Sequence, residues 1–245
     1  MRIALVSDAW VPQVNGVVRT LRMLVQNLEA AGHAVATVTP DRFLTVPCPT
    51  YPEIRLALKP RRRVAALIDA HRPDAIHIAT EGPLGMAARA VCLRRGLPFT
   101  TAFHTRFPDY VAARFAVPPD WVYAWLRRFH APSRGVMVAT ATVRRDLAAR
   151  GFTGLRHWGR GVDDRLFDPA RRAEAFATDL GLKRPLFLFV GRVAVEKILP
   201  AFLDLDLPGS KLVGGGVPLR ETCRRRYPTV HFTGSQEGDA LARSD

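Results

Sequence analysis

The amino-acid sequence predicts an α/β protein built from doubly wound, mostly parallel sheets. Short β-prone runs alternate with longer segments of helical periodicity through residues 1–150, which is the pattern of repeated βαβ units. The same alternation starts again at Leu186, which indicates a second domain of the same kind. The longest apolar runs, such as Leu186 to Val190, are far shorter than a bilayer-spanning helix.

The first βαβ unit has the clearest pattern. Arg2 to Val6 is predicted to be a strand, Val17 to about Ala31 a helix ended by Gly32, and Ala34 to Val38 the next strand. The other predicted elements of this domain are, in order, a helix at Arg61 to His71, a strand at Ala75 to Ile78, a helix at Pro83 to Arg95, a strand at Phe99 to Ala102, helices at Asp109 to Phe115 and Asp120 to His130, a strand at Val136 to Ala139 and a helix from about Val143 to Arg150.

The second domain is predicted from a shorter series of the same elements. They are a short polar helix at Arg171 to Leu180, strands at Leu186 to Val190, Lys211 to Val213 and Val230 to Phe232, and helices at Lys197 to Leu205 and Leu219 to Tyr227. We therefore expect domains at residues 1–165 and 166–245. Three strands are fewer than a doubly wound domain normally contains, so the second domain is expected to be incomplete.

The charge balance favours an anionic partner. The 245 residues include 36 basic and 22 acidic ones, a net charge of +14 that suits a phosphate-bearing substrate, nucleic acid or an acidic membrane surface. An arginine-rich composition also arises from genomic base bias. The basic run at Lys59 to Arg63 is isolated from aromatic residues, which argues against nucleic acid and favours a solvated patch or a membrane-facing edge.

The N-terminus carries no pattern of a secretory signal. Its apolar run meets Ser7 and Asp8 within a few residues, too soon for the apolar core of such a signal. A cytoplasmic location is expected, with peripheral attachment to the inner face of the membrane left open.

The loop from Pro12 to Arg19 joins the first strand to the first helix, at the edge where parallel sheets bind ligands. Gly16 would let a backbone N–H approach a phosphate, and the following helix would offer its positive end. An ordinary tight turn is the alternative. No Gly-x-Gly-x-x-Gly or Walker pattern is present, so the sequence gives little support to a nicotinamide site or a P-loop.

Two cations follow the first strand of the second domain. Arg192 and Lys197 come after Gly191 at a strand-to-helix junction, and their spacing would let them close on one diphosphate from two sides. The alternative is an exposed turn in which Glu196 pairs with Lys197.

His104 directly follows a predicted buried strand, again at the ligand-binding edge. It could donate a hydrogen bond to a substrate hydroxyl, act as an acid or base, or be structural. His77, in contrast, is expected to face the core beside Ile76 and Ile78. Asp204-Leu-Asp206 resembles a metal-binding Asp-x-Asp pair, but it lies at the end of a predicted helix and is closed by a turn, so no metal site is expected.

These segments together resemble a known family. The run from Ser7 to Arg19, the His104 segment, Arg160-Gly-Val-Asp163 with Phe167, and Gly191-Arg192 followed by Glu196-Lys197 look like the retaining glycosyltransferases of the GT-B fold, family 4. Within them the chain resembles the GDP-mannose-dependent α-mannosyltransferases. The resemblance implies two Rossmann-like domains and transfer of a hexose, mannose in that subgroup, from a nucleotide sugar to a lipid or glycan acceptor.

The resemblance also implies roles for individual residues. Gly16, Val17, Gly191, Arg192 and Lys197 would bind the donor, and His104, Arg192 and Lys197 would be catalytic. A further set would hold the acceptor: Asn15, Arg19, Thr105, Arg106 and Tyr110. The resemblance implies no metal or other cofactor. In the front-face mechanism proposed for the family, a diphosphate oxygen of the donor helps to deprotonate the acceptor, so no protein carboxylate is needed as the nucleophile.

The sequence departs from the family pattern in two places. Val213-Gly-Gly-Gly-Val-Pro218 replaces a Val-Gly-x-Gly-Pro turn, and the Glu-x7-Glu segment of relatives is expected to lie beyond Asp245. A C-terminally truncated glycosyltransferase is the expectation. The alternative is a catalytically degenerate paralogue that binds an anionic lipid or a partner, and nucleic acid is not expected as a partner.

Overall fold

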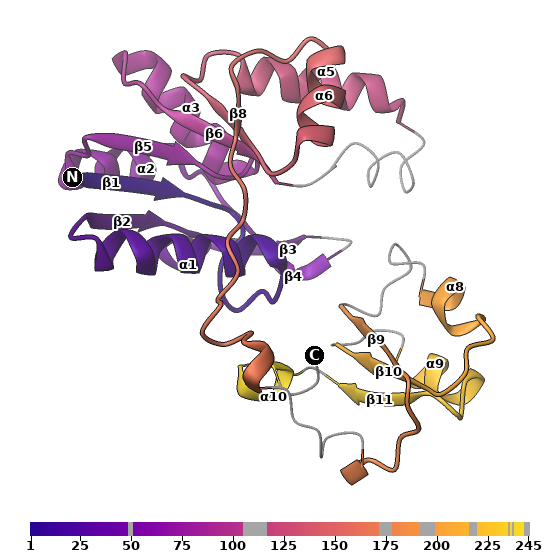
Figure 1. Cartoon of the computed structure of the whole chain (residues 1–245). Coiled ribbons are helices and arrows are strands. Elements are labelled where there is room, and N and C mark those ends of the chain that lie inside the picture. Colours follow the sequence, from indigo (N-terminus) through magenta and orange to yellow (C-terminus); the bar gives the residue numbers. More distant parts are fainter. Residues whose placement is uncertain are drawn as a thin grey trace. The chain divides into compact units, whose positions relative to one another are not determined.

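The computed structural model describes residues 1–48, 51–104, 117–171, 178–191, 199–215, 220–234, 236 and 238–242. The chain divides into two compact units, Met1–Arg160 and Gly161–Asp245 (Figure 1). The boundary expected from the sequence, 165/166, lies in the turns that follow this division. None of the helices in the described ranges has both the length and the apolar character of a membrane-spanning segment.

A six-stranded parallel sheet forms the centre of the first unit. Its strand order is β2-β1-β5-β6-β7-β8 (Figure 1). The strands are β1 (Arg2–Val6), β2 (Ala34–Val38), β5 (Ala75–Ile78), β6 (Thr100–Phe103), β7 (Val136–Val138) and β8 (Leu155–His157). The order reverses direction at β1, which is the arrangement of a doubly wound sheet. The first five of these strands in the chain were predicted, and β8 was not.

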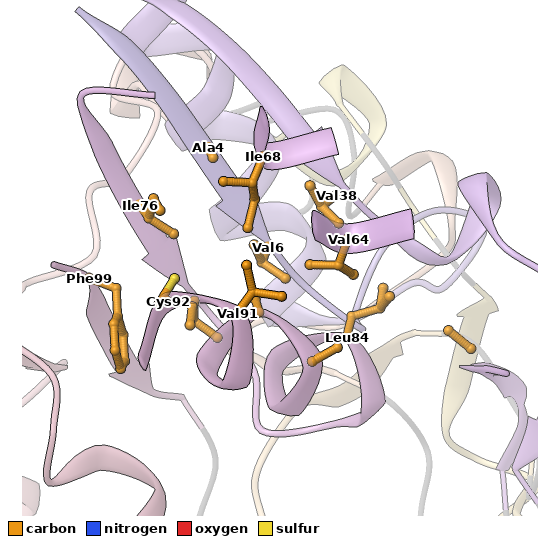
Figure 2. Packing of buried hydrophobic residues seen from close by; sticks show 14 of the residues in the cluster. Ala4, Val6, Val38, Val64, Ile68, Ile76, Leu84, Val91, Cys92 and Phe99 are labelled. Atoms are coloured by element: carbon orange, nitrogen blue, oxygen red, sulfur yellow. The ribbon is translucent and has the colours of Figure 1, made fainter. Parts of the chain in front are cut away.

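Helices cover both faces of this sheet. They are α1 (Gly16–Ala30), α2 (Arg61–His71), α3 (Pro83–Arg95), α5 (Pro119–His130) and α6 (Ala141–Ala149). Successive strand residues point to opposite faces. Leu5 therefore packs with Leu21 of α1, whereas Val6 packs in the cluster that contains residues of α2 and α3. Figure 2 shows this second cluster, with Ile68 and Val91 directed toward Val6.

The predicted helices of this unit agree closely with the structure where it is described. The helix expected at Asp109 to Phe115 lies outside the described residues. Leu126 of α5 and Leu147 of α6 pack with Phe103 and Val136, which extends the core toward the β8 edge of the sheet. These contacts fix the helices against the strands and so fix the loops at the strand ends.

An antiparallel hairpin between β2 and α2 was missed by the sequence analysis. Its strands are β3 (Thr45–Cys48) and β4 (Tyr51–Ala57), and a short 3-10 helix, η1 (Pro40–Arg42), precedes it. Pro47 and Pro52 stand inside these strands. Proline cannot donate to a strand ladder, so it conceals a strand in the sequence pattern, but a two-stranded ribbon has outer edges that tolerate it.

The second unit contains a three-stranded parallel sheet in the order β11-β10-β9. Its elements are η2 (Pro169–Arg171), β9 (Leu186–Val190), α8 (Leu199–Leu203), β10 (Ser210–Gly214), α9 (Arg220–Arg226), β11 (His231–Gly234) and α10 (Asp239–Ala242). Leu199 and Leu203 of α8 pack with Val213 and Phe232 of the strands. The three predicted strands are confirmed. Most of the helix expected at Arg171 to Leu180, and the start of the one expected at Lys197, lie outside the described residues.

Candidate functional site

Polar residues gather where the central strands of the first sheet end. Because β1, β5 and β6 are parallel, their carboxyl ends meet at one edge, and Asp8, Thr80 and His104 follow them there. Open α/β sheets bind ligands at this edge, next to the strand where the order reverses. In this sheet that strand is β1, which carries the loop to α1.

Asp8 anchors the first turn of α3 to this edge. Its carboxylate accepts hydrogen bonds from the backbone N–H groups of Leu84 (2.8 Å) and Gly85 (3.2 Å) and from the hydroxyl of Thr80 (2.8 Å). Burial raises the pKa of the Asp8 carboxyl above its ordinary value, and these three donors act in the opposite direction. The sequence analysis gave this residue no role. The structure makes it a cap that fixes α3, a structural part of the edge.

The loop before α1 is held by a chain of side-chain hydrogen bonds. The Gln13 side-chain amide donates to the backbone carbonyl of Asp8 (3.2 Å). The Asn15 side-chain amide donates to Oε1 of the Gln13 side chain (3.3 Å). The Asn15 oxygen accepts from the backbone N–H groups of Val17 and Val18, each at 3.0 Å. Asn15 is thus the N-cap of α1. Val17 is expected to bind the donor, but its N–H already donates to the Asn15 side chain. The N–H of Gly16 takes no part in this cap.

Arg160, the last residue of the first unit in the chain, lies beside this loop. Its guanidinium donates to the backbone carbonyl of His104 (3.3 Å). A Cβ placed on Gly16 would lie 3.7 Å from the same guanidinium, so the cation stands beside the first residue of α1. The positive end of a helix and a guanidinium next to it together favour an anion. Gly16 itself is exposed, and Arg19 lies exposed in the first turn of the same helix.

His104 presents a neutral imidazole to this edge. Burial, with a smaller contribution from Arg160, lowers its pKa to about 4. Its ring meets Trp158 edge-on, with centroids 5.7 Å apart. Nε2 is buried and has no hydrogen-bond partner among the described residues. A neutral imidazole at pH 7 can donate or accept one hydrogen bond at each nitrogen according to its tautomer, which suits contact with a sugar hydroxyl.

The expectation for His77 was wrong about the face of the sheet. Ile76 and Ile78 are buried in the cluster under α2 and α3, and the alternation along β5 turns His77 to the opposite face. There its ring meets the Trp158 ring edge-on, with centroids 5.8 Å apart, and Nδ1 lies 2.9 Å from the Thr100 hydroxyl. Burial lowers the pKa of His77 to about 4. Trp158 therefore joins two neutral histidines on this face.

We predict that His77 and His104 make the folded chain less stable in mild acid. In the folded chain both histidines have a pKa of about 4, whereas an ordinary histidine has a pKa of 6.5. Between these two pH values the unfolded chain therefore binds more protons than the folded chain. Their contribution to stability is fully present above pH 6.5 and is lost as the pH falls toward 4, by at most about 3 kcal/mol for each ring. Urea unfolding at pH 7 and pH 5 should show that the free energy of unfolding falls less for His77→Asn than for the unmodified chain. The substitution control is His157→Asn, at an exposed position in β8; an unchanged loss in His77→Asn would contradict the prediction.

In the second unit, glycines stand at the carboxyl end of each strand. The N–H of Gly191, after β9, donates to the carbonyl of Gly214 (2.9 Å), and the N–H of Gly215 donates to that of Gly234 (2.7 Å). A Cβ on Gly215 would lie 1.7 Å from the Gly191 carbonyl oxygen, so only glycine permits this approach of the two loops. The strand pairing of β10 with β11 is irregular at Val213/Gly214, within the triple-glycine run that the sequence analysis singled out.

Several expected site residues cannot be placed. Thr105, Arg106, Tyr110, Arg192 and Lys197 lie outside the described residues. Those that are described fall at two edges: Asn15, Gly16, Val17, Arg19 and His104 in the first unit, and Gly191 in the second. Arg160 was given no role as a site residue, although it begins the Arg160-Gly-Val-Asp163 segment that contributes to the family resemblance.

The described residues hold no group of three or more His, Cys, Asp or Glu side chains placed to bind a metal ion. Asp204, from the Asp-x-Asp pair, instead accepts a hydrogen bond of 2.6 Å from the Tyr227 hydroxyl. This bond ties the end of α8 to the end of α9.

Comparison with known proteins gives consistent results. The model of a family described as Glycosyltransferase Family 4 matches residues 14–166. A GDP-mannose-dependent alpha-mannosyltransferase of Mycolicibacterium smegmatis is 30% identical over 99% of the chain and 70% of its own length. The sulfoquinovosyl transferase SQD2 of Arabidopsis thaliana is 29% identical over 94% of the chain and 50% of its own length.

The fold has a solved counterpart. A sucrose-phosphate synthase from Thermosynechococcus elongatus superposes with a TM-score of 0.67 at 19% identity, and the match covers 99% of the chain and 72% of that structure. This likeness concerns the fold alone. It confirms the predicted α/β GT-B class with parallel, Rossmann-like sheets.

Proposed function

The chain belongs to Glycosyltransferase Family 4, and we propose that it transfers mannose from GDP-mannose to a lipid or glycan acceptor, with retention of the sugar's anomeric configuration. Similarity to several GDP-mannose-dependent relatives supports the choice of donor. The observation that carries the proposal is the position of the Arg160 guanidinium, which joins His104 to the first residue of α1 at the ligand-binding edge. The reaction takes place on the cytoplasmic side, where the acceptor is reached at the membrane or in solution.

Two groups of residues are proposed to bind the donor. In the first unit they are Gly16 and Val17 at the positive end of α1, together with Arg160. In the second unit they are Gly191, Arg192 and Lys197. For the acceptor we propose five residues: Asn15, Arg19, Thr105, Arg106 and Tyr110. The Asn15 side chain already caps α1, so its contribution would be to fix the loop that an acceptor meets.

The chemistry explains why cations are needed. The bond between the anomeric carbon and the diphosphate oxygen breaks, and its electron pair stays on GDP, which gains negative charge. The acceptor oxygen bonds to the same face of the anomeric carbon, and its proton passes to the departing diphosphate. Fixed cations stabilise this charge more in the transition state than in the ground state. We propose that Arg192 and Lys197 perform this task without a metal, while neutral His104 hydrogen-bonds the sugar.

Calorimetry with the full chain tests the proposal. GDP and GDP-mannose should bind, UDP-glucose should bind more weakly, and EDTA should leave the affinities unchanged. Arg160→Ala should weaken GDP binding about tenfold, the loss of one charge-assisted contact. With α-[1-¹³C]mannose in the donor, NMR should show an α-linked product. If none of these nucleotides binds at millimolar concentration, the proposed function is wrong for this chain, and a non-catalytic binding module replaces it.

A further inference from the structure

Trp158 stands directly after β8, at the carboxyl edge of the first sheet. Its backbone N–H donates to the carbonyl of Val138 (2.8 Å), so the pairing of β7 with β8 continues through this residue. Its side chain packs against Leu5 and Leu21, in the cluster between the sheet and α1. The tryptophan is therefore fixed both through its backbone and through its side chain.

The His104 ring depends on packing for its orientation. Its Nε2 atom is buried and has no hydrogen-bond partner among the described residues. A buried polar atom without a partner costs about 1–3 kcal/mol, so the ring keeps this position only because its surroundings hold it there. His77 differs, because its Nδ1 lies 2.9 Å from the Thr100 hydroxyl, a contact that can fix that ring.

Trp158 supplies the aromatic contact of both histidines. Its indole meets the His104 ring with centroids 5.7 Å apart and an angle of 62° between the planes. It meets the His77 ring with centroids 5.8 Å apart and an angle of 84°. Aromatic rings favour such edge-on geometry, which restricts how each ring can turn. Strands β5 and β6 and the segment after β8 thus meet at one tryptophan.

The same segment also contacts the backbone of His104. Arg160, two residues after Trp158, donates to the His104 carbonyl (3.3 Å). Two described groups bear on the charge of the imidazole, Arg160 and His77, and both disfavour its protonation, as burial does to a larger extent. Helix α1 contributes uncharged residues to the cluster around Trp158. Every one of these contacts favours the neutral ring.

We propose that Trp158 is a positioning residue, which keeps water from the His104 imidazole and holds the ring in one orientation against the donor sugar. A neutral ring can donate one hydrogen bond and accept another, whereas an imidazolium can only donate. A cation there would also oppose the positive charge that develops on the anomeric carbon as the donor bond breaks. The sugar contact rests on the proposed function, but the shielding of the ring needs no substrate.

NMR of the full chain with ¹³C-labelled histidine, without nucleotide, measures the shielding. The His104 signal is identified by its loss in His104→Gln, and in the unmodified chain it should titrate with a pKa of about 4. Trp158→Ala should raise this pKa above about 5.5, because the ring becomes hydrated. The matched control Trp121→Ala removes an exposed tryptophan of α5 and should leave the His104 pKa unchanged.

The pH dependence of transfer separates positioning from a purely structural role. Between pH 7.5 and pH 5.5, kcat of Trp158→Ala should fall at least about twofold more than kcat of the unmodified chain, because its His104 becomes partly cationic. Trp158→Phe keeps an aromatic ring and should restore the original profile and the low His104 pKa. Trp158→Leu keeps apolar bulk against α1, so it replaces Trp158→Ala if circular dichroism shows that the alanine variant is unfolded.

Three results would overturn the proposal. The first is a His104 pKa that stays near 4 in a folded Trp158→Ala or Trp158→Leu chain. The second is an equal rise of this pKa in Trp121→Ala. The third is an active Trp158 variant with a raised His104 pKa and an unaltered pH profile, because the charge of the ring would then not matter for transfer. A chain that transfers no sugar would contradict the proposed function, and the NMR titration would still decide whether Trp158 shields His104.

Discussion

Arg192→Ala is expected to lower kcat about 10²–10³-fold, because the proposed function gives this arginine the task of stabilising the leaving diphosphate. Gly191 follows strand β9 at the carboxyl edge of its sheet, the edge where such sheets bind ligands, and Arg192 is the next residue in the sequence. The charge on the diphosphate grows as the sugar departs, so the loss should fall mainly on kcat rather than on KM. Lys197→Ala should lower kcat in the same direction.

Steady-state kinetics with GDP-mannose measures both constants. Arg224→Ala is the matched control, since Arg224 is an exposed arginine of α9 in the same unit and its loss should leave kcat unchanged. Equal values of both kcat and KM for Arg192→Ala and the unmodified chain would remove Arg192 from the catalytic site. A change confined to KM would instead mean that Arg192 binds the ground state and the transition state equally.

The sequence predicted the parallel strands because buried strands in such sheets carry nearly continuous apolar runs between helical patterns. The missed elements lack that signal. Strand β8, Leu155-Arg156-His157, is a polar edge strand, and β3 and β4 contain prolines. His77 shows a different limit: the strand was predicted, but its two faces are both covered, so apolar neighbours did not reveal which way the histidine points.

Part of the candidate site follows from strand ends alone. His104 directly follows β6, and Gly16 begins the helix that comes after β1. Because these strands are parallel, the connections that leave them start at one edge of the sheet. Arg160 could not be inferred in this way. It is 56 residues from His104 in the chain, and the contact depends on the path of the segment after β8. Asp8 was missed for the same reason, since its partners on α3 are 76 and 77 residues away.

Gly85→Ala is expected to destabilise the first unit by about 2–3 kcal/mol, although alanine is the better helix former. A Cβ at this position of α3 would lie 1.8 Å from the Thr80 carbonyl oxygen and 2.9 Å from the carbonyl carbon. The obstacle is backbone, which cannot rotate away as a side chain can. The helix end must therefore move from β5, and Asp8 then loses its hydrogen bonds to Leu84 and Gly85.

The two opposing effects on Gly85→Ala differ in size. Replacing glycine by alanine inside a helix stabilises it by at most about 1 kcal/mol. Overpacking costs typically about 1–3 kcal/mol, and more where hydrogen bonds of a buried carboxylate are also lost. Thermal unfolding should show a midpoint lower by about 5–10 °C. Gly161→Ala is the control, because no heavy atom lies within 4 Å of its added Cβ. An unchanged midpoint for Gly85→Ala would mean that α3 can shift without loss, and Asp8 would then not be its anchor.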